Sequence, residues 1–321
     1  MYKTNVLFCA ALVTCSLLIL GCEESNGSSP SVDFQRQLRA DAKCFSGATG
    51  NFDSCLNVNT IEEVKRVSNQ YNYPDPSSAS LPNGFNPENY RAPIRLADTK
   101  DAPNFKLVEY FTLNELMPTS KGRWGLISSI ALDLFNSLRK AVNAPLIVNS
   151  AFRSPAHNAN VEGSATWSRH MYGDAFDFYS TKKSLRDLKK MCQRFGASFI
   201  QVYSTHIHCD WRDSLKDPDF FGPDQVLPPA VSVDRVLQDL AKLEVGTEDT
   251  LLFAQVTNLI KEDEGQLEYI WKLTTPNGDV IEQSTESFEY NLVLEGLYHL
   301  QVEVGGHIQL DQSFEWSHHE H

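Results

Sequence analysis

Three stretches of the chain concentrate residue types that hold metal ions and move protons. They are residues 150–158 (SAFRSPAHN), 168–177 (SRHMYGDAFD) and 206–210 (HIHCD). A hydrolytic zinc site needs three protein ligands with nitrogen or oxygen donors and one open position for water. His170, Asp177 and His208 can supply that set. The sequence therefore predicts a zinc site built from these three side chains.

Two predicted strands would carry these ligands, because side chains two residues apart along a strand share a face. Residues 175–179 alternate so that Asp177 faces one side and its phenylalanine neighbours face the apolar side. Residues 199–210 predict one long strand. Three of its side chains share one face: His206, His208 and Asp210. The alternation thus places one ligand on each strand.

Two amphipathic helices are predicted to cover these strands. Residues 124–142 carry apolar side chains at helical spacing. Residues 185–195 form a second helix, which ends before Gly196 as a C-terminal cap requires. The apolar run 145–148 predicts a further strand. Helices and strands interleave irregularly, which is typical of an α+β fold.

Three of the seven cysteines lie in the first 22 residues, and the other four allow three disulfide pairings. We favour Cys44 with Cys55, which closes a short glycine-containing loop. We also favour Cys192 with Cys209, because Cys209 faces away from the metal side of its strand, toward the helix that carries Cys192. This bond would join the helix to the strand that bears His208.

The pattern S-x-H-x-x-G-x-A-x-D at 168–177, with H-x-H at 206–208, resembles the zinc D-alanyl-D-alanine carboxypeptidases and murein endopeptidases of clan MD. These enzymes share the Hedgehog/DD-peptidase fold. The resemblance covers residues from about 105 to 210. The segment SAFR at 150–153 adds to it, since it resembles the S-G-Y-R of that family. Together these motifs are far more specific than any one of them.

The resemblance implies a zinc metallopeptidase that hydrolyses peptide bonds in the stems of peptidoglycan. It implies three zinc ligands: His170, Asp177 and His208. Arg153 would bind a substrate carboxylate or carbonyl oxygen, and Ser168 would position the substrate. His206 would act as the general base or stabilise the transition state. Asp210 is expected to orient a ligand histidine.

Two positions depart from that family. Members often carry an acidic residue three positions before the last ligand, where this chain has Thr205, so proton transfer would fall to His206, Asp210 or another residue. The paired glycines of the family appear here as Glu162-Gly163. The alternative hypothesis is a non-catalytic, lipid-anchored wall-binding protein with a peptidase-like domain. Three ligands at family spacing favour the enzyme.

The N-terminal segment predicts export. Lys3 precedes a mostly apolar run over residues 6–20. This run is shorter than the roughly 20 residues that span a bilayer, which favours a signal peptide over an uncleaved helix. The sequence LILGC ending at Cys22 resembles the lipobox of bacterial lipoproteins. That resemblance implies an acylated Cys22 that anchors the chain to a membrane, with the outer membrane facing the periplasm as the expected location.

The C-terminal part predicts a second module. From about residue 231 the chain has short strand-like runs, with an Asn-Gly turn at 277–278. This favours an immunoglobulin-like β-sandwich, and Trp271 with Gly296 resembles the polycystic-kidney-disease-like repeat. This module is a candidate for binding a protein or glycan partner. The predicted parts are 1–21 (signal peptide), 22–33 (Ser/Gly tether), 34–104 (N-terminal extension), 105–212 (zinc peptidase), 213–230 (Pro-rich linker) and 231–321 (sandwich).

Composition narrows the class of partner. The chain has 321 residues, of which 41% are hydrophobic and 21% charged, as in ordinary globular proteins. Its formal net charge is −13, and no basic stripe is present. Binding to a phosphate backbone requires clustered Lys and Arg, so we expect no nucleic-acid partner.

Overall fold

The computed structural model describes residues 42–223, 231–262 and 264–317, all within one compact unit, Leu38–His321. The predicted signal peptide and tether, with Cys22, lie outside the described residues. Within the described part of the chain, no helix is long and apolar enough to cross a membrane. One large hydrophobic core spans residues 45–221 and a second spans residues 203–316, so the described chain has two main cores.

A four-stranded antiparallel sheet lies at the centre of the first core. Its strand order is β5 (Ile147–Ser150), β6 (Ala175–Tyr179), β8 (Ile207–Asp210) and β7 (Phe199–Val202). The predicted long strand over 199–210 is wrong, because Tyr203 N donates to His206 O at 2.9 Å and folds this run into a hairpin. In β8 the alternation holds, and Asp177 of β6 is in register with His208.

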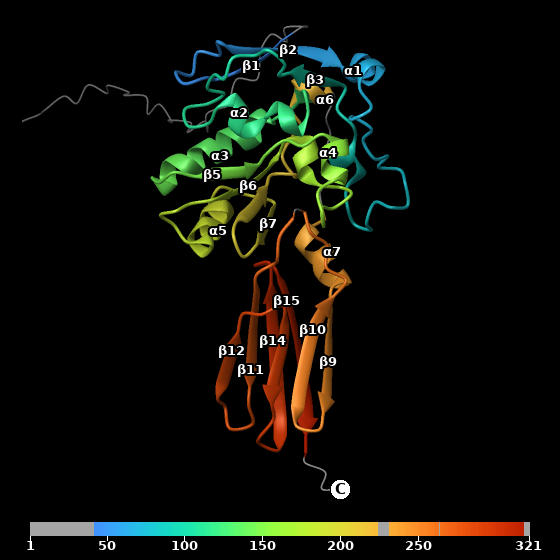
Figure 1. The fold of residues 1–321 in the computed structure, drawn as a ribbon, viewed down its shortest axis with the longest axis vertical. Helices are drawn as coiled ribbons and strands as arrows, with labels where there is room; N and C mark the ends of the chain where they lie inside the picture. Colours follow the sequence, from blue (N-terminus) through green and yellow to red (C-terminus); the bar gives the residue numbers. More distant parts are fainter. Residues whose placement is uncertain (1–41, 224–230, 263, 318–321) are drawn as a thin grey trace, which may run out of the picture. The chain divides into compact units, whose positions relative to one another are not determined.

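Two helices cover the apolar face of this sheet, α3 (Ser129–Val142) and α5 (Leu185–Arg194) (Figure 1). Phe135 of α3 stacks on Phe176 of β6 with 4.3 Å between ring centroids. The predicted start of α3 at residue 124 is wrong. Residues 124–125 instead form β4 (Trp124–Gly125), and the helix begins after Ser128, whose hydroxyl accepts from Ala131 N.

Both favoured disulfides are confirmed. Cys44 bonds to Cys55 across the hairpin of β1 (Ala42–Phe45) and β2 (Ser54–Thr60). Cys192 of α5 bonds to Cys209 of β8. Gly196 takes a φ of 69° after α5, as the predicted cap requires. The second disulfide therefore ties a covering helix to the strand that carries His208.

Removing that disulfide should destabilise the fold. Cys192 and Cys209 are 17 residues apart, and closing a loop of this size restricts the unfolded chain. We expect the double substitution to Ala to lower the free energy of unfolding by about 3 kcal/mol. Urea denaturation of both proteins measures it. A loss below about 1 kcal/mol would show that the bond does little for stability.

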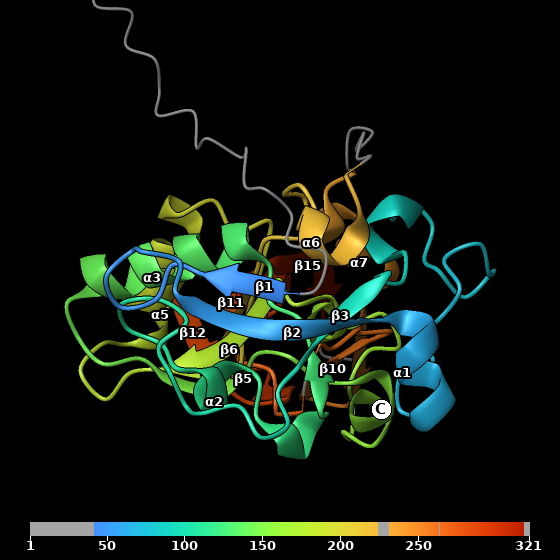
Figure 2. The ribbon, with the colours of Figure 1, turned by 90° about the horizontal axis from the view of Figure 1, so that it is seen from above.

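The predicted N-terminal extension is folded into the first core. β1 and β2 continue through β3 (Arg95–Asp98) to β4, in the order β1-β2-β3-β4. Figure 2 shows the first three of these strands. Short helices connect them: α1 (Ile61–Val67), η1 (Pro87–Tyr90), α2 (Leu113–Leu116) and η2 (Thr119–Lys121). The predicted N-terminal extension therefore contains the strands β1, β2 and β3. This sheet packs its apolar residues into the core that also holds β6.

The predicted linker also begins inside this core. Its residues 218–221 form α6 (Pro218–Phe221), and both phenylalanines are buried. Lys43 of β1 lies 2.7 Å from Asp217 and 2.8 Å from Asp219, and its side chain is 1% exposed. Buried ion pairs of this kind fix the segment, so the linker prediction is wrong for residues 217–221.

Seven strands in two antiparallel sheets form the second core. One sheet has the order β13-β10-β9, and the other has β12-β11-β14-β15. The strands are β9 (Lys242–Glu248), β10 (Leu251–Thr257), β11 (Tyr269–Thr274), β12 (Val280–Gln283), β13 (Ser287–Asn291), β14 (Gly296–Val304) and β15 (Ile308–Trp316). Trp271 and Phe288 pack between the sheets, 5.6 Å apart. The helix α7 (Val233–Leu240) precedes them. The predicted Asn-Gly turn joins β11 to β12, while the immunoglobulin class remains a prediction.

Acid should weaken the fold through His307, in the turn between β14 and β15. Burial lowers the pKa of His307 from about 6.5 to about 4, and its ring packs on Phe199 at 4.7 Å. The unfolded chain therefore binds this proton at a higher pH than the folded chain. Stability from this group is full above about pH 6.5 and is lost as the pH falls toward 4.

We expect this group to make the free energy of unfolding about 2 kcal/mol lower at pH 5 than at pH 7.5. The His307→Gln variant lacks the titrating ring, so its stability should fall less between the two pH values. Urea denaturation of both proteins at each pH measures the difference. Equal pH dependence in the two proteins would refute the assignment to His307.

Candidate metal centre

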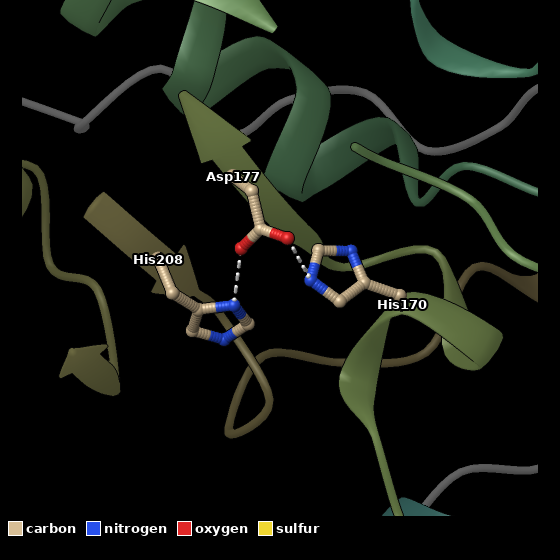
Figure 3. A group of neighbouring side chains, drawn as sticks. All are labelled: His170, Asp177 and His208. Carbon is tan, nitrogen blue, oxygen red and sulfur yellow. Dashed lines mark hydrogen bonds and ion pairs between the residues drawn. The ribbon is translucent and has the colours of Figure 1, made fainter. Parts of the chain in front are cut away.

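Three buried side chains converge on the polar face of the central sheet. His170, Asp177 and His208 each offer one ligand atom, and these atoms all lie within 4.8 Å of one another. Asp177 Oδ2 lies 2.9 Å from His170 Nε2, and Asp177 Oδ1 lies 2.8 Å from His208 Nδ1. Figure 3 shows the carboxylate of Asp177 between the two imidazole rings. The structure thus brings together the three ligands that the sequence predicts.

Local structure explains how His170 reaches the sheet. It lies in η3 (Arg169–Tyr172), a short turn that leads into β6. Gly173 ends this turn with a φ of 70°, and a Cβ at this position would lie 2.4 Å from the backbone oxygen of Leu126. Only glycine fits such a conformation and such a close approach. The glycine of the motif is therefore required by the turn that positions His170.

The imidazole of His170 is oriented by the backbone. Its Nδ1 lies 2.7 Å from the carbonyl oxygen of Ala151, which fixes the proton on Nδ1. Its Nε2 is buried and has no hydrogen-bond partner, although Asp177 is close. Burial and then the Arg153 guanidinium lower the pKa of His170, so the ring is neutral at pH 7. A neutral ring with a buried lone pair directed at a carboxylate is the form that binds metal.

His208 is held by a carboxylate behind it. Its Nε2 lies 3.0 Å from Asp210, which leaves Nδ1 facing Asp177. Arg212 donates to both oxygens of Asp210. Burial lowers the pKa of His208, but the hydrogen bonds with Asp177 and Asp210 outweigh it and raise the pKa to about 10. A metal ion at Nδ1 must therefore displace a proton, so binding should release one.

Arg153 contacts a candidate metal ligand and also lines a pocket. Its Nη2 lies 2.7 Å from Asp177 Oδ2, and its Nε donates to Ser150 Oγ at 2.8 Å. The guanidinium also lines a pocket of about 480 Å³. Arg153 can therefore pair with Asp177 and still line the pocket.

The pocket beside the metal site contains further polar groups. Its lining includes Lys121, His157, Thr205, His206 and Glu264. The ring of His206 stacks on Tyr203 at 4.5 Å, and its Nδ1 lies 3.1 Å from the Thr205 hydroxyl. The structure therefore places His206 and Arg153 at the same pocket. A second pocket, of about 690 Å³, shares no residue with this one and is lined by residues 53–57, Asp98, residues 100–103 and Phe105.

Ser168 is placed differently from the prediction. Its side chain is fully buried and its hydroxyl donates to the backbone oxygen of Glu262 at 3.3 Å. It is not among the residues that line the pocket. Its predicted contact with substrate remains a prediction, and in the described structure Ser168 holds a segment of the second module.

Sequence reasoning missed a buried ionic network behind the ligands. Arg169 pairs with Asp174, and Lys216 lies 3.0 Å from the same carboxylate. Arg212 bonds Asp210 and also lies 3.1 Å from Glu262. Arg169 and Asp174 both lie within residues 168–177, and two opposite charges in this short motif were the available signal for a charge pair.

The donor set suits zinc. Two imidazoles and one carboxylate are a common ligand set of hydrolytic zinc sites, and carboxylate or backbone partners commonly orient such imidazoles. The two histidines here have such partners, Asp210 and the Ala151 carbonyl. The buried Nε2 of His170, which lacks a hydrogen-bond partner, fits a metal ion as its missing partner. The residues present therefore fit a single zinc ion.

The fold and the site define a candidate metal site of two imidazoles and one carboxylate on an antiparallel sheet. Residues 109–210 match the model of the family described as Peptidase M15. This segment contains all three ligands, and the match supports a peptidase in a family that typically depends on zinc. Comparison with curated proteins and with solved structures gave no match.

Proposed function

We propose that this chain is a zinc metallopeptidase that hydrolyses peptide bonds in peptidoglycan stems, as a D-Ala-D-Ala carboxypeptidase or a murein endopeptidase. The observation that carries the proposal is the convergence of His170, Asp177 and His208 within the segment that matches Peptidase M15. The pocket lined by Arg153 and His206 adds a place for the substrate.

The residues around the centre have distinct roles in this proposal. A bound zinc ion would lower the pKa of a water molecule toward about 7 and polarise the peptide carbonyl. Arg153 would place a positive charge beside the substrate oxygen that gains negative charge. His206 would carry the proton to the leaving amine. Asp210 would keep the proton of His208 on Nε2, so that Nδ1 stays free for the metal.

We also propose export and anchoring through an acylated Cys22, which would place the peptidase at the outer membrane, facing the periplasm. The support is the resemblance of LILGC to a lipobox. Labelling of cells with a radioactive fatty acid tests it. Incorporation should be lost in Cys22→Ser, and label that persists in this variant would contradict the anchor.

Digestion of purified, cross-linked peptidoglycan tests the proposed activity. The chain from Glu23 onward is incubated with it, and the products are resolved by mass. Loss of terminal D-Ala would identify a carboxypeptidase, and conversion of dimers to monomers would identify an endopeptidase. Both should disappear on chelation and return with zinc. Unchanged peptidoglycan, with zinc bound, would favour the non-catalytic wall-binding alternative.

A further inference from the structure

We propose that Glu262, in the segment that joins β10 to β11 of the second module, is a positioning residue of the metal centre. The inference rests on the metal site of the proposed function and goes beyond it, because it assigns a part of that site to a module outside the peptidase segment. That module would then be a structural component of the centre and not only an attached domain.

Glu262 is buried against the peptidase segment. Its side chain is 3% exposed, and its backbone oxygen accepts from the hydroxyls of Ser164 and Ser168 at 3.4 and 3.3 Å. Its backbone nitrogen donates to Gln201 Oε1 at 3.4 Å. A carboxylate at such depth is costly unless its partners compensate for lost hydration.

Its two carboxylate oxygens reach the supports of both histidine ligands. Oε2 accepts from the backbone nitrogen of Arg169, directly before His170, at 3.3 Å. Oε1 accepts from Arg212 Nη2 at 3.1 Å. Arg212 in turn holds Asp210, which bonds His208 Nε2. The Glu262 side chain thus contacts the turn that carries His170. Through Arg212 and Asp210 it is also connected to His208.

The backbone keeps this segment in register with the sheet. Ser204 N donates to Gln266 O at 3.0 Å, and Glu268 N donates to Val202 O at 3.1 Å. On the same edge of β7, Val202 N donates to Gly305 O at 2.6 Å. These bonds follow Glu262 in the sequence, and together with the bond from its own nitrogen to Gln201 they hold the segment against the sheet.

The test is the zinc affinity of Glu262→Gln, measured by competition with a chromogenic chelator. Gln keeps the shape but loses the charge that balances Arg212. Outer partners of metal sites typically contribute about 10–100-fold to affinity, and we expect a loss in this range. The cobalt-substituted variant should also show a changed visible spectrum, because the positions of both imidazoles depend on Glu262.

Glu282→Gln is the matched control, since Glu282 pairs with Lys272 on the exposed surface of the same module. It should bind zinc like the unmodified chain. If Glu262→Gln does not fold, Glu262→Asp replaces it, because Asp keeps the charge but draws it back from Arg169 and Arg212. A folded variant with unchanged zinc affinity and cobalt spectrum would overturn the proposal. Since neither readout involves hydrolysis, this failure is distinct from a failure of the proposed activity.

Discussion

His170→Ala should abolish both zinc binding and peptide hydrolysis. His170 supplies one of three ligand atoms that lie within 4.8 Å, and its removal leaves only one imidazole and one carboxylate. Loss of a residue that orients a metal ligand typically lowers metal affinity or activity about 10–100-fold. Loss of a ligand itself should therefore lower kcat/KM by more than about 100-fold. The zinc content of the dialysed protein and its turnover of a stem peptide are the measurements.

His157→Ala is the matched control for this experiment. His157 lines the same pocket as Arg153 but does not belong to the ligand group. It should keep one zinc ion per chain after the same dialysis. A His170→Ala protein that retains one tightly held zinc ion would contradict the assignment of the ligands.

Lys43→Met should cause the largest loss of stability. The ammonium group of Lys43 is buried and bonds Asp217, Asp219 and Ser129. Its removal leaves two acidic side chains near one another without their cation. Breaking a buried ion pair from one side typically costs about 3–5 kcal/mol, and we expect a loss in this range from the free energy of unfolding. Urea denaturation at pH 7.5 measures it.

Lys272→Met provides the comparison, because Lys272 pairs with Glu282 at the exposed surface. Such pairs are worth about 0–1 kcal/mol, so this variant should remain close to the unmodified chain. Adding Asp217→Asn to Lys43→Met should restore part of the loss, since it removes one stranded charge. Equal losses in Lys43→Met and Lys272→Met would show that the buried pair is not a significant source of stability.

The faces of Asp177 and His208 and the Cys192–Cys209 disulfide were predictable because they depend on alternation along a strand. Alternation along a strand separates His208 from Cys209, and the structure keeps this separation in β8. The same rule places Asp177 opposite the phenylalanines that pack on α3. Where a site depends on side chains two residues apart on one strand, the alternation of polar and apolar residues is sufficient to predict which face they share.

The predicted elements were wrong where contacts with residues distant in the sequence outweigh the local hydrophobic pattern. The predicted helix begins at residue 124, but pairing of β4 with β3 takes residues 124–125 into a sheet, and residues 126–128 belong to neither helix nor strand. The hairpin at 203–206 contains none of the usual Gly, Asn or Pro turn residues, so the run reads as continuous strand. In the sequence, Asp217 and Asp219 resemble the polar residues of a linker. In the structure they pair with Lys43, which is distant in the sequence.

Glu262 shows the same limit at the candidate site. Its neighbours Lys261 and Glu264 are charged, and such a run is usually solvated. Its burial follows from Arg169 and Arg212, which lie 93 and 50 residues away. The local hydrophobic pattern does not indicate these contacts. The link between the second module and the candidate metal site is therefore visible only in the folded structure.

Titration of the metal-free chain with zinc, while hydrolysis of a stem peptide is followed, tests the central claim most directly. Activity should rise in proportion to added zinc and reach its plateau at one equivalent, with products that lack D-Ala or a cross-link. Binding of one zinc equivalent with no hydrolysis of any stem peptide or cross-linked dimer would contradict the peptidase and leave a metal-binding, wall-associated protein.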